Sequence, residues 1–162
     1  MSTIYHIDNP APENGHVTPF VVSFEDHFKA LSLPAIDFGC GDEALTFIID
    51  SGSDVCYINR TTAGRLGLKI GREETEEGKE RVIGTGNGIA KSSGESCEAV
   101  LSLDNYKFNV RFLVEDFDSL AAFLKNNGGV TVHGILGTNF LASNNWQIDF
   151  MHKVAYPVFK LN

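Results

Sequence analysis

The 162-residue sequence lacks several features that would assign it to large functional classes. It has only three cysteines, Cys40, Cys56 and Cys97, too few and too widely spaced to indicate a disulfide framework. We therefore expect free thiols and a reducing compartment. The five histidines show no metal-ligand spacing with one another or with the cysteines, so we expect neither a metal site nor another cofactor.

Basic residues are also scarce. Thirteen lysines and arginines stand against 21 aspartates and glutamates, which gives a formal net charge of −8. Such a charge argues against nucleic acid or an anionic membrane as the main partner. No apolar run approaches the roughly 18 residues that would span a bilayer. The N-terminus carries no visible secretory signal, which leaves the cytoplasm as the default expectation.

The composition itself, with 43% hydrophobic and 21% charged residues, is typical of a soluble globular protein. The length favours one domain, and the pattern of short apolar segments between turns predicts a mostly β, closed or folded-over domain with a few short helices. Residues 1–19 contain prolines among polar residues and are expected to be irregular. The predicted strands cover 20–24, 33–38, 45–49, 55–58, 82–83, 89–90, 96–103, 107–114, 130–136, 146–150 and 154–159, and the predicted helices cover 25–31, 60–66, 118–124 and 139–143.

The most informative segment is Asp50-Ser51-Gly52-Ser53, which directly follows the apolar run at 45–49. A carboxylate at the end of a buried strand is costly unless it is hydrogen-bonded or shares a proton with a partner. Gly52 permits a close backbone approach that a side chain would block, and the two serine hydroxyls can orient the carboxylate and its turn. The triplet alone is weak, because most such triplets are surface turns.

Two further segments support a chemical role for the triplet. Ile135-Leu136-Gly137 is a second apolar-apolar-glycine element, although on its own it fits ordinary core packing. The glycine-rich segment at 84–88 predicts the tip of a hairpin, and an ordinary mobile turn stays open as an alternative. No Gly-Lys-Ser/Thr follows it, which argues against a nucleotide-phosphate loop. Only one Asp-Ser-Gly is present, so a second such carboxylate would have to come from another copy of the chain.

In order and in content, these segments resemble the retroviral-type (retropepsin-like) aspartic peptidases. The resemblance covers roughly residues 31–160 and implies a closed β-barrel peptidase domain at 31–162 that follows an N-terminal arm or extension at 1–30. The matching segments are Phe47-Ile48-Ile49-Asp50-Ser51-Gly52-Ser53, Ile58, the stretch from Ala63 to Leu68, Gly84-Thr85-Gly86-Asn87-Gly88, the stretch from His133 to Leu141, and Ile148-Asp149-Phe150.

The resemblance implies an aspartic endopeptidase that acts on peptides or proteins as a homodimer, without a metal. Two Asp50 carboxylates, one from each subunit, would hold a single proton and activate a water molecule. Ser51 would bond backbone across the dimer, and the Ser53 hydroxyl would bond the carboxylate, lowering the dyad pKa values and biasing activity to acidic pH. Gly84, Thr85, Gly86, Asn87 and Gly88 would form a flap over the substrate, Asp54 would lie at the edge of the cleft, and Ile135, Leu136 and Gly137 would pack beneath the catalytic turn.

Two alternatives stay open: a weakly catalytic or non-catalytic dimer that binds extended peptides by strand addition, and a structural β-barrel dimer in which Asp50 only caps its turn.

Thr138 stands where viral members often carry an arginine paired with Asp54, which weakens the expected support for the dimer. The C-terminal segment at 154–159 is predicted to supply interface strands.

Other residues are predicted to have structural roles. Asn59 and Asp118 are expected to cap helices, Asp37 is expected to face solvent, and His133 and Asp149 are expected to be structural. Cys56 is expected near the active turn, where its oxidation would reduce activity.

Overall fold

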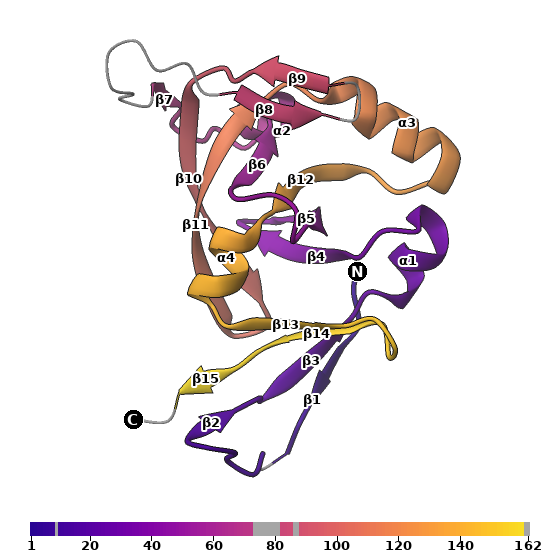
Figure 1. Cartoon of the computed structure of the whole chain (residues 1–162), viewed down its shortest axis with the longest axis vertical. Coiled ribbons are helices and arrows are strands. Elements are labelled where there is room, and N and C mark those ends of the chain that lie inside the picture. Colours follow the sequence, from indigo (N-terminus) through magenta and orange to yellow (C-terminus); the bar gives the residue numbers. More distant parts are fainter. Residues whose placement is uncertain (9, 73–81, 86–87, 161–162) are drawn as a thin grey trace.

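The computed structural model describes residues 1–8, 10–72, 82–85 and 88–160. Its centre is a barrel of six strands that confirms the predicted closed, mostly β architecture (Figure 1). The barrel closes because β10 pairs with both β4 and β11, and the short strand β7 (Gly71–Arg72) adds to the margin of β10. In spatial order the barrel strands are β11 (Tyr106–Glu115), β6 (Cys56–Asn59), β12 (Val132–Leu136), β5 (Glu43–Ile49), β4 (Ala35–Cys40) and β10 (Glu95–Leu103).

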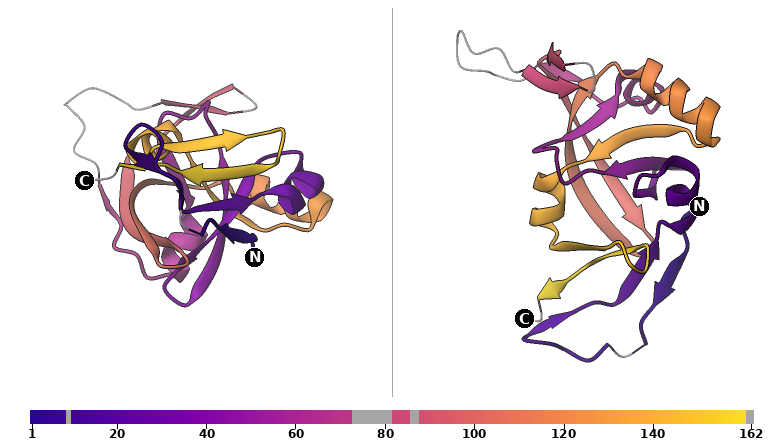
Figure 2. Two further views of the ribbon diagram at one scale, coloured as in Figure 1. Left: turned by 90° about the horizontal axis from the view of Figure 1, so that it is seen from below. Right: turned by 45° about the vertical axis from the view of Figure 1, so that its right-hand side comes forward.

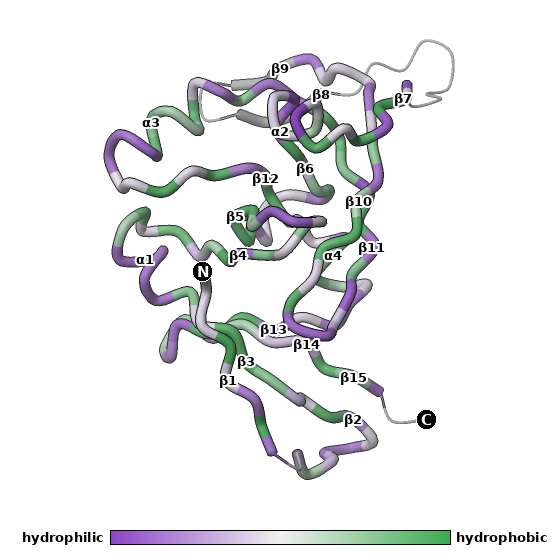
Figure 3. Tube along the Cα trace, turned by 180° about the vertical axis from the view of Figure 1, so that it is seen from behind, coloured by the Kyte–Doolittle hydropathy of each residue, from purple (hydrophilic) through white to green (hydrophobic). Residues whose placement is uncertain are grey.

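The barrel strands form because their apolar residues recur with the two-residue period of a strand. Along β10, Ala99 and Leu101 are buried, whereas Glu98 and Val100, which alternate with them, are exposed. Figure 3 shows hydrophobic stretches along β6 and β10. Aromatic rings fill much of the interior, and each fully buried one contributes about 1.5–3 kcal/mol through removal from water. The buried rings in mutual contact are Phe38, Phe47, Phe108, Phe112, Phe140 and Trp146.

A second sheet, which we call the terminal sheet, joins both ends of the chain below the barrel (Figures 1 and 2). Its order is β1 (Ile4–His6), β3 (Phe20–Ser23), β14 (Val154–Pro157) and β13 (Trp146–Asp149). A separate pair joins β2 (His16–Val17) to β15 (Phe159–Lys160). The expectation of irregular backbone throughout 1–19 is therefore wrong at β1 and β2, because strand pairing orders them. The division of the chain at residue 30 stays a prediction.

The position of β14 also corrects the predicted role of the C-terminal segment. β14 pairs with β13 on one side and with β3 on the other, all within one chain. A strand that has neighbours on both sides has no ladder left for a strand from a second subunit. At Val154 and Ala155, which pair on both sides, no ladder is left for an intermolecular strand, whereas Tyr156 and Pro157 pair with β13 alone.

Four short helices lie where the sequence predicts them: α1 (Glu25–Leu31), α2 (Arg60–Arg65), α3 (Asp118–Gly128) and α4 (Thr138–Ser143). None of the helices in the described ranges combines the length and apolar character needed to cross a membrane. On the barrel side opposite the terminal sheet, β8 (Val82–Thr85) and β9 (Gly88–Lys91) form the predicted antiparallel hairpin (Figure 2). The sequence has a cluster of charged residues at 72–80, of which 73–80 lie outside the described residues.

The two predicted helix caps have different outcomes. Asn59 does occupy the N-cap position of α2, but its buried side chain makes no capping bond there. Its Nδ2 atom instead donates to Asp118 Oδ1 at 2.5 Å, and Thr61 Oγ1 donates to Asp118 Oδ2 at 2.9 Å. Phe117 occupies the N-cap of α3, and Asp118 is its first helical residue. A contact between helices thus replaces two local caps.

Asp37 is buried rather than exposed, because α1 and the N-terminal residues cover the outer face of β4. Its Oδ1 atom accepts hydrogen bonds from His27 Nε2 at 2.9 Å and from Thr46 Oγ1 at 2.7 Å. The amino group of Met1 lies 3.3 Å from Oδ2. Burial opposes ionisation, but the hydrogen bonds from His27 and Thr46 outweigh it and hold the pKa of Asp37 well below its usual range.

Candidate active site

Asp50 lies where two parallel strands of the barrel end together. β5 carries the buried residues Ile48 and Ile49 up to Asp50, and Ile49 is in register with Leu136 of β12. The Asp50 N–H continues this ladder by donating to the Leu136 carbonyl at 3.0 Å. The half-buried carboxylate is therefore fixed at a rigid strand end rather than on a free loop.

The backbone after Asp50 folds back onto its own carboxylate. The Gly52 N–H donates to Asp50 Oδ1 at 2.8 Å, and the Ser53 N–H donates to the Asp50 carbonyl at 3.2 Å. A methyl group at position 52 would lie 3.1 Å from Oδ1, tighter than most such contacts. Within the described residues, Asp50 Oδ2 receives no hydrogen bond. One carboxylate oxygen is thus oriented by the turn, and the other is held by no hydrogen bond from the described residues.

The two serines of this turn differ in their surroundings. Ser51 is exposed, and its hydroxyl makes no hydrogen bond to any part of the chain that the structure describes. Ser53 Oγ donates to the Val55 carbonyl at 2.7 Å. The expected bond from Ser53 to the Asp50 carboxylate is therefore not formed. The expectation that activity is biased to acidic pH depended on that bond and loses its physical basis.

The segment Ile135-Leu136-Gly137 is brought against the Asp50 turn. A methyl group at Gly137 would lie 2.3 Å from the Val55 carbonyl oxygen and 2.7 Å from that of Ser53, so no side chain fits there. Thr138, the first residue of α4, donates to the Ser53 carbonyl through its N–H at 2.7 Å and through Oγ1 at 3.0 Å. From the sequence we noted only that position 138 lacks an arginine, and we did not predict these two bonds from Thr138 to Ser53, which we call the Thr138 clamp. The sequence signal for the clamp was the hydroxyl residue directly after Gly137.

Cys56 also lies at this junction, but it is fully buried. Its thiol donates to Asn139 Oδ1 at 3.1 Å, and the Gly137 N–H approaches the sulfur at 3.4 Å. Burial raises the pKa of Cys56, which leaves little of the reactive thiolate. The structure therefore argues against Cys56 as an oxidation-sensitive residue and gives it a packing role. Cys40 and Cys97 are likewise free and buried.

His133 and Asp149 take local structural contacts. His133 Nδ1 accepts a hydrogen bond from the Thr46 N–H at 2.9 Å, and burial lowers the pKa of this imidazole. Both effects favour the neutral ring. Asp149 bonds His152 three residues along the chain.

The remaining predicted site residues lie on exposed or only partly described segments. Asp54 is exposed just after the Asp50 turn. Gly84, Thr85 and Gly88 lie in the β8–β9 hairpin and pair across it, with Thr85 opposite Gly88. Gly86 and Asn87, which were predicted to form its tip, lie outside the described residues.

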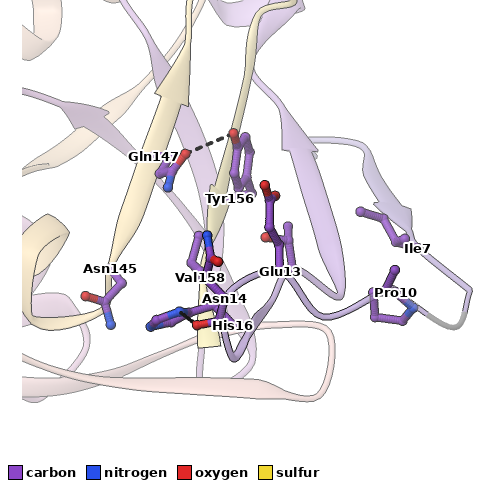
Figure 4. Close-up of a pocket in the computed structure, with 11 residues that line it drawn as sticks. Ile7, Pro10, Glu13, Asn14, His16, Asn145, Gln147, Tyr156 and Val158 are labelled. Carbon is purple, nitrogen blue, oxygen red and sulfur yellow. Dashed lines mark hydrogen bonds between the residues drawn. The ribbon is translucent and has the colours of Figure 1, made fainter. Parts of the chain in front are cut away.

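A separate cavity of about 560 Å³ lies beside the terminal sheet (Figure 4). Its lining includes Glu13, His16, Gln147 and Tyr156, and Tyr156 Oη donates to Gln147 Oε1 at 3.1 Å. None of the residues predicted to form the site lines it. We therefore place the candidate active site at the Asp50 turn and not in this cavity.

Comparison with known proteins agrees with this geometry. A family model described as aspartyl protease matches residues 36–140, well over half of the chain, and includes both Asp50 and Gly137. The chain belongs to the aspartyl protease family. None of the curated proteins compared gives a significant match.

Solved structures of three proteins are similar to this chain. The retroviral protease-like domain of Ddi1 from Leishmania major has 16% identity and a TM-score of 0.51, covering 80% of this chain and 96% of that one. The EIAV protease in complex with the inhibitor HBY-793 has 19% identity and a TM-score of 0.49, covering 73% and 93%. A retropepsin-like aspartic protease from Rickettsia conorii has 15% identity and a TM-score of 0.46, covering 99% and 97%. At these identities the Ddi1 match shows the retropepsin-like fold.

Proposed function

We propose that this protein is an aspartic endopeptidase whose active form is a homodimer with one Asp50 from each subunit. The observation that supports it most directly is the construction of the Asp50 turn. One carboxylate oxygen is held by the Gly52 N–H, and the turn is clamped from below by Gly137 and Thr138. A carboxylate that merely capped its own turn would not need this second, distant segment beneath it.

The chemistry needs two such groups. Two carboxylates at a two-fold axis cannot both ionise easily, so the pair holds one proton and titrates as a unit. The ionised member takes a proton from water, and the protonated member polarises the carbonyl of the scissile bond. A tetrahedral diol forms, and the dyad then returns a proton to the leaving nitrogen.

The exposed position of Ser51 and Gly52 supports a dimer contact through the turn itself. The Ser51 hydroxyl would bond the partner's backbone there. The β8–β9 hairpin would act as the flap that closes over an extended peptide and excludes water. Since Val154 and Ala155 of β14 are already paired on both sides, the dimer would form without exchange of that strand.

The test is incubation with a diverse peptide library at several pH values. The wild type is compared with Asp50→Asn and with Asp42→Asn, which removes an exposed carboxylate at the opposite end of β5. We expect cleavage by the wild type and by Asp42→Asn, blocked by a statine-type inhibitor, and no cleavage by Asp50→Asn with the fold intact. Peptide binding without cleavage by the wild type would instead identify a binding module. Sedimentation measured alongside would reveal whether active fractions are dimers.

A further inference from the structure

A buried carboxylate that the proposed chemistry does not use lies at the base of the β8–β9 hairpin. Glu115, the last residue of β11, is 8% exposed, and so is Ser92, which directly follows β9. The Ser92 hydroxyl donates to Glu115 Oε1, and the Ser93 N–H donates to both carboxylate oxygens, at 3.0 and 3.1 Å. A buried acid is rarely placed without a reason, because its desolvation must be offset by such donors.

The same short segment makes further bonds that fix it as a unit. Ser93 Oγ donates to the Val114 carbonyl at 2.5 Å. The Gly94 N–H reaches Ser92 Oγ at 3.3 Å, and the Glu95 N–H reaches Ser93 Oγ at 3.2 Å. Gly94 has a φ of +68°, a backbone conformation that favours glycine, so the chain turns sharply here before it enters β10. The hairpin is therefore joined to β10 by a tight turn at residues 92–95 that these hydrogen bonds hold in place.

This turn is connected to the catalytic turn through one pair of strands. β11 runs parallel to β6, with Glu115 opposite Asn59 and Phe112 opposite Cys56. β6 begins directly after the Asp50 turn, and Cys56 contacts the Gly137 N–H beneath that turn. The base of the hairpin and the support of the catalytic carboxylate are thus mounted on the same rigid pair.

We infer that Glu115, with Ser92 and Ser93, forms a hinge clasp that sets the position of the β8–β9 hairpin, and that Glu115 is a positioning residue for peptide binding. Loss of the carboxylate leaves the Ser92 hydroxyl and the Ser93 N–H without their acceptor, which frees the hairpin base while the barrel stays paired. The part of the inference that concerns peptide binding rests on the proposed peptidase function; the mechanical part does not.

Hydrogen–deuterium exchange of the intact protein tests the clasp. Glu115→Ala removes the acceptor, Glu115→Gln keeps an acceptor of the same shape without the charge, and Ser92→Ala removes one donor. Glu98→Gln is the matched control, because Glu98 is an exposed carboxylate on neighbouring β10. We expect exchange over residues 82–95 to become about 10- to 100-fold faster in Glu115→Ala, the range for hydrogen bonds to a charged group. The increase should be smaller in Glu115→Gln and Ser92→Ala, with none in the control.

The outcomes separate a clasp from general stabilisation. Exchange over residues 99–108, the far part of the β10–β11 hairpin, should stay at the wild-type rate. Equal acceleration throughout the chain, or unchanged exchange over 82–95 in both Ser92→Ala and Glu115→Gln, would overturn the clasp. Where the wild type cleaves peptide, Glu115→Gln should raise KM several-fold with a smaller change in kcat. If Asp50→Asn proved as active as the wild type, the peptidase proposal would fail while the exchange measurement would still decide the clasp.

Discussion

Replacement of Gly137 by alanine tests whether the segment Ile135-Leu136-Gly137 supports the Asp50 turn. The added methyl group would lie 2.3 Å from the Val55 carbonyl oxygen, and such contacts are essentially never shorter than 3.0 Å, so the backbone must move by about 0.7 Å. Overpacking of this kind costs about 1–3 kcal/mol of unfolding free energy. For a chain of this size, that lowers Tm by roughly 2–12 °C.

The same movement would displace the Asp50 turn, because Gly137 and Thr138 contact its far side. A misplacement near 1 Å can reduce catalysis by about 100-fold, so kcat/KM should fall far more than folding alone explains. Gly64→Ala is the matched control: Gly64 lies in α2 with open space around it, and alanine there should stabilise the helix by up to about 1 kcal/mol. Urea unfolding and peptide cleavage are measured for both. A Gly137→Ala protein with wild-type stability and activity would refute the argument that this glycine is required for close packing.

Three further results are expected. Asp37→Asn should lower the unfolding free energy at pH 7 by roughly 1.5–3 kcal/mol. Since the folded pKa of Asp37 lies below its unfolded value, its stabilisation is present above about pH 4 and is lost as the pH falls. The unfolding free energy measured with urea should therefore decline less steeply below pH 4 in the variant than in the wild type. Thr138→Val should cost about 1 kcal/mol or less through loss of the hydroxyl bond to Ser53, with Thr138→Ser restoring it; equal Tm values for all three proteins would contradict the clamp. Cys56 should resist aromatic disulfide reagents in the folded protein and react once urea unfolds the chain. Rapid reaction of Cys56 in the folded protein would contradict the packing role given to this thiol.

Much of the fold follows from local pattern. The alternation along β10 and β11 and the turn residues Asp104 and Asn105 predict that hairpin, and the structure pairs residues 96–103 with residues 106–113. The β4–β5 hairpin and the four helices are predicted for similar reasons, because turn chemistry and hydrophobic period are properties of neighbouring residues.

The errors arise where a distant segment decides the outcome. Asp37 has the spacing of an exposed strand residue, and only the packing of α1 over β4 reveals that it is buried. Asn59 has the sequence signature of a helix cap, but Asp118, far along the chain, takes its side chain. The Ser53 hydroxyl was expected to bond the Asp50 carboxylate, but the fold of the turn pairs it with the Val55 carbonyl.

The self-contained terminal sheet separates folding from association. Strands from both chain ends pair within a single polypeptide, with β3 and β14 adjacent at its centre. We therefore expect a single chain to reach its native conformation without a second copy. For the proposed enzyme, dilution should abolish turnover while circular dichroism and melting temperature stay unchanged, so that catalytic output is set by protein concentration.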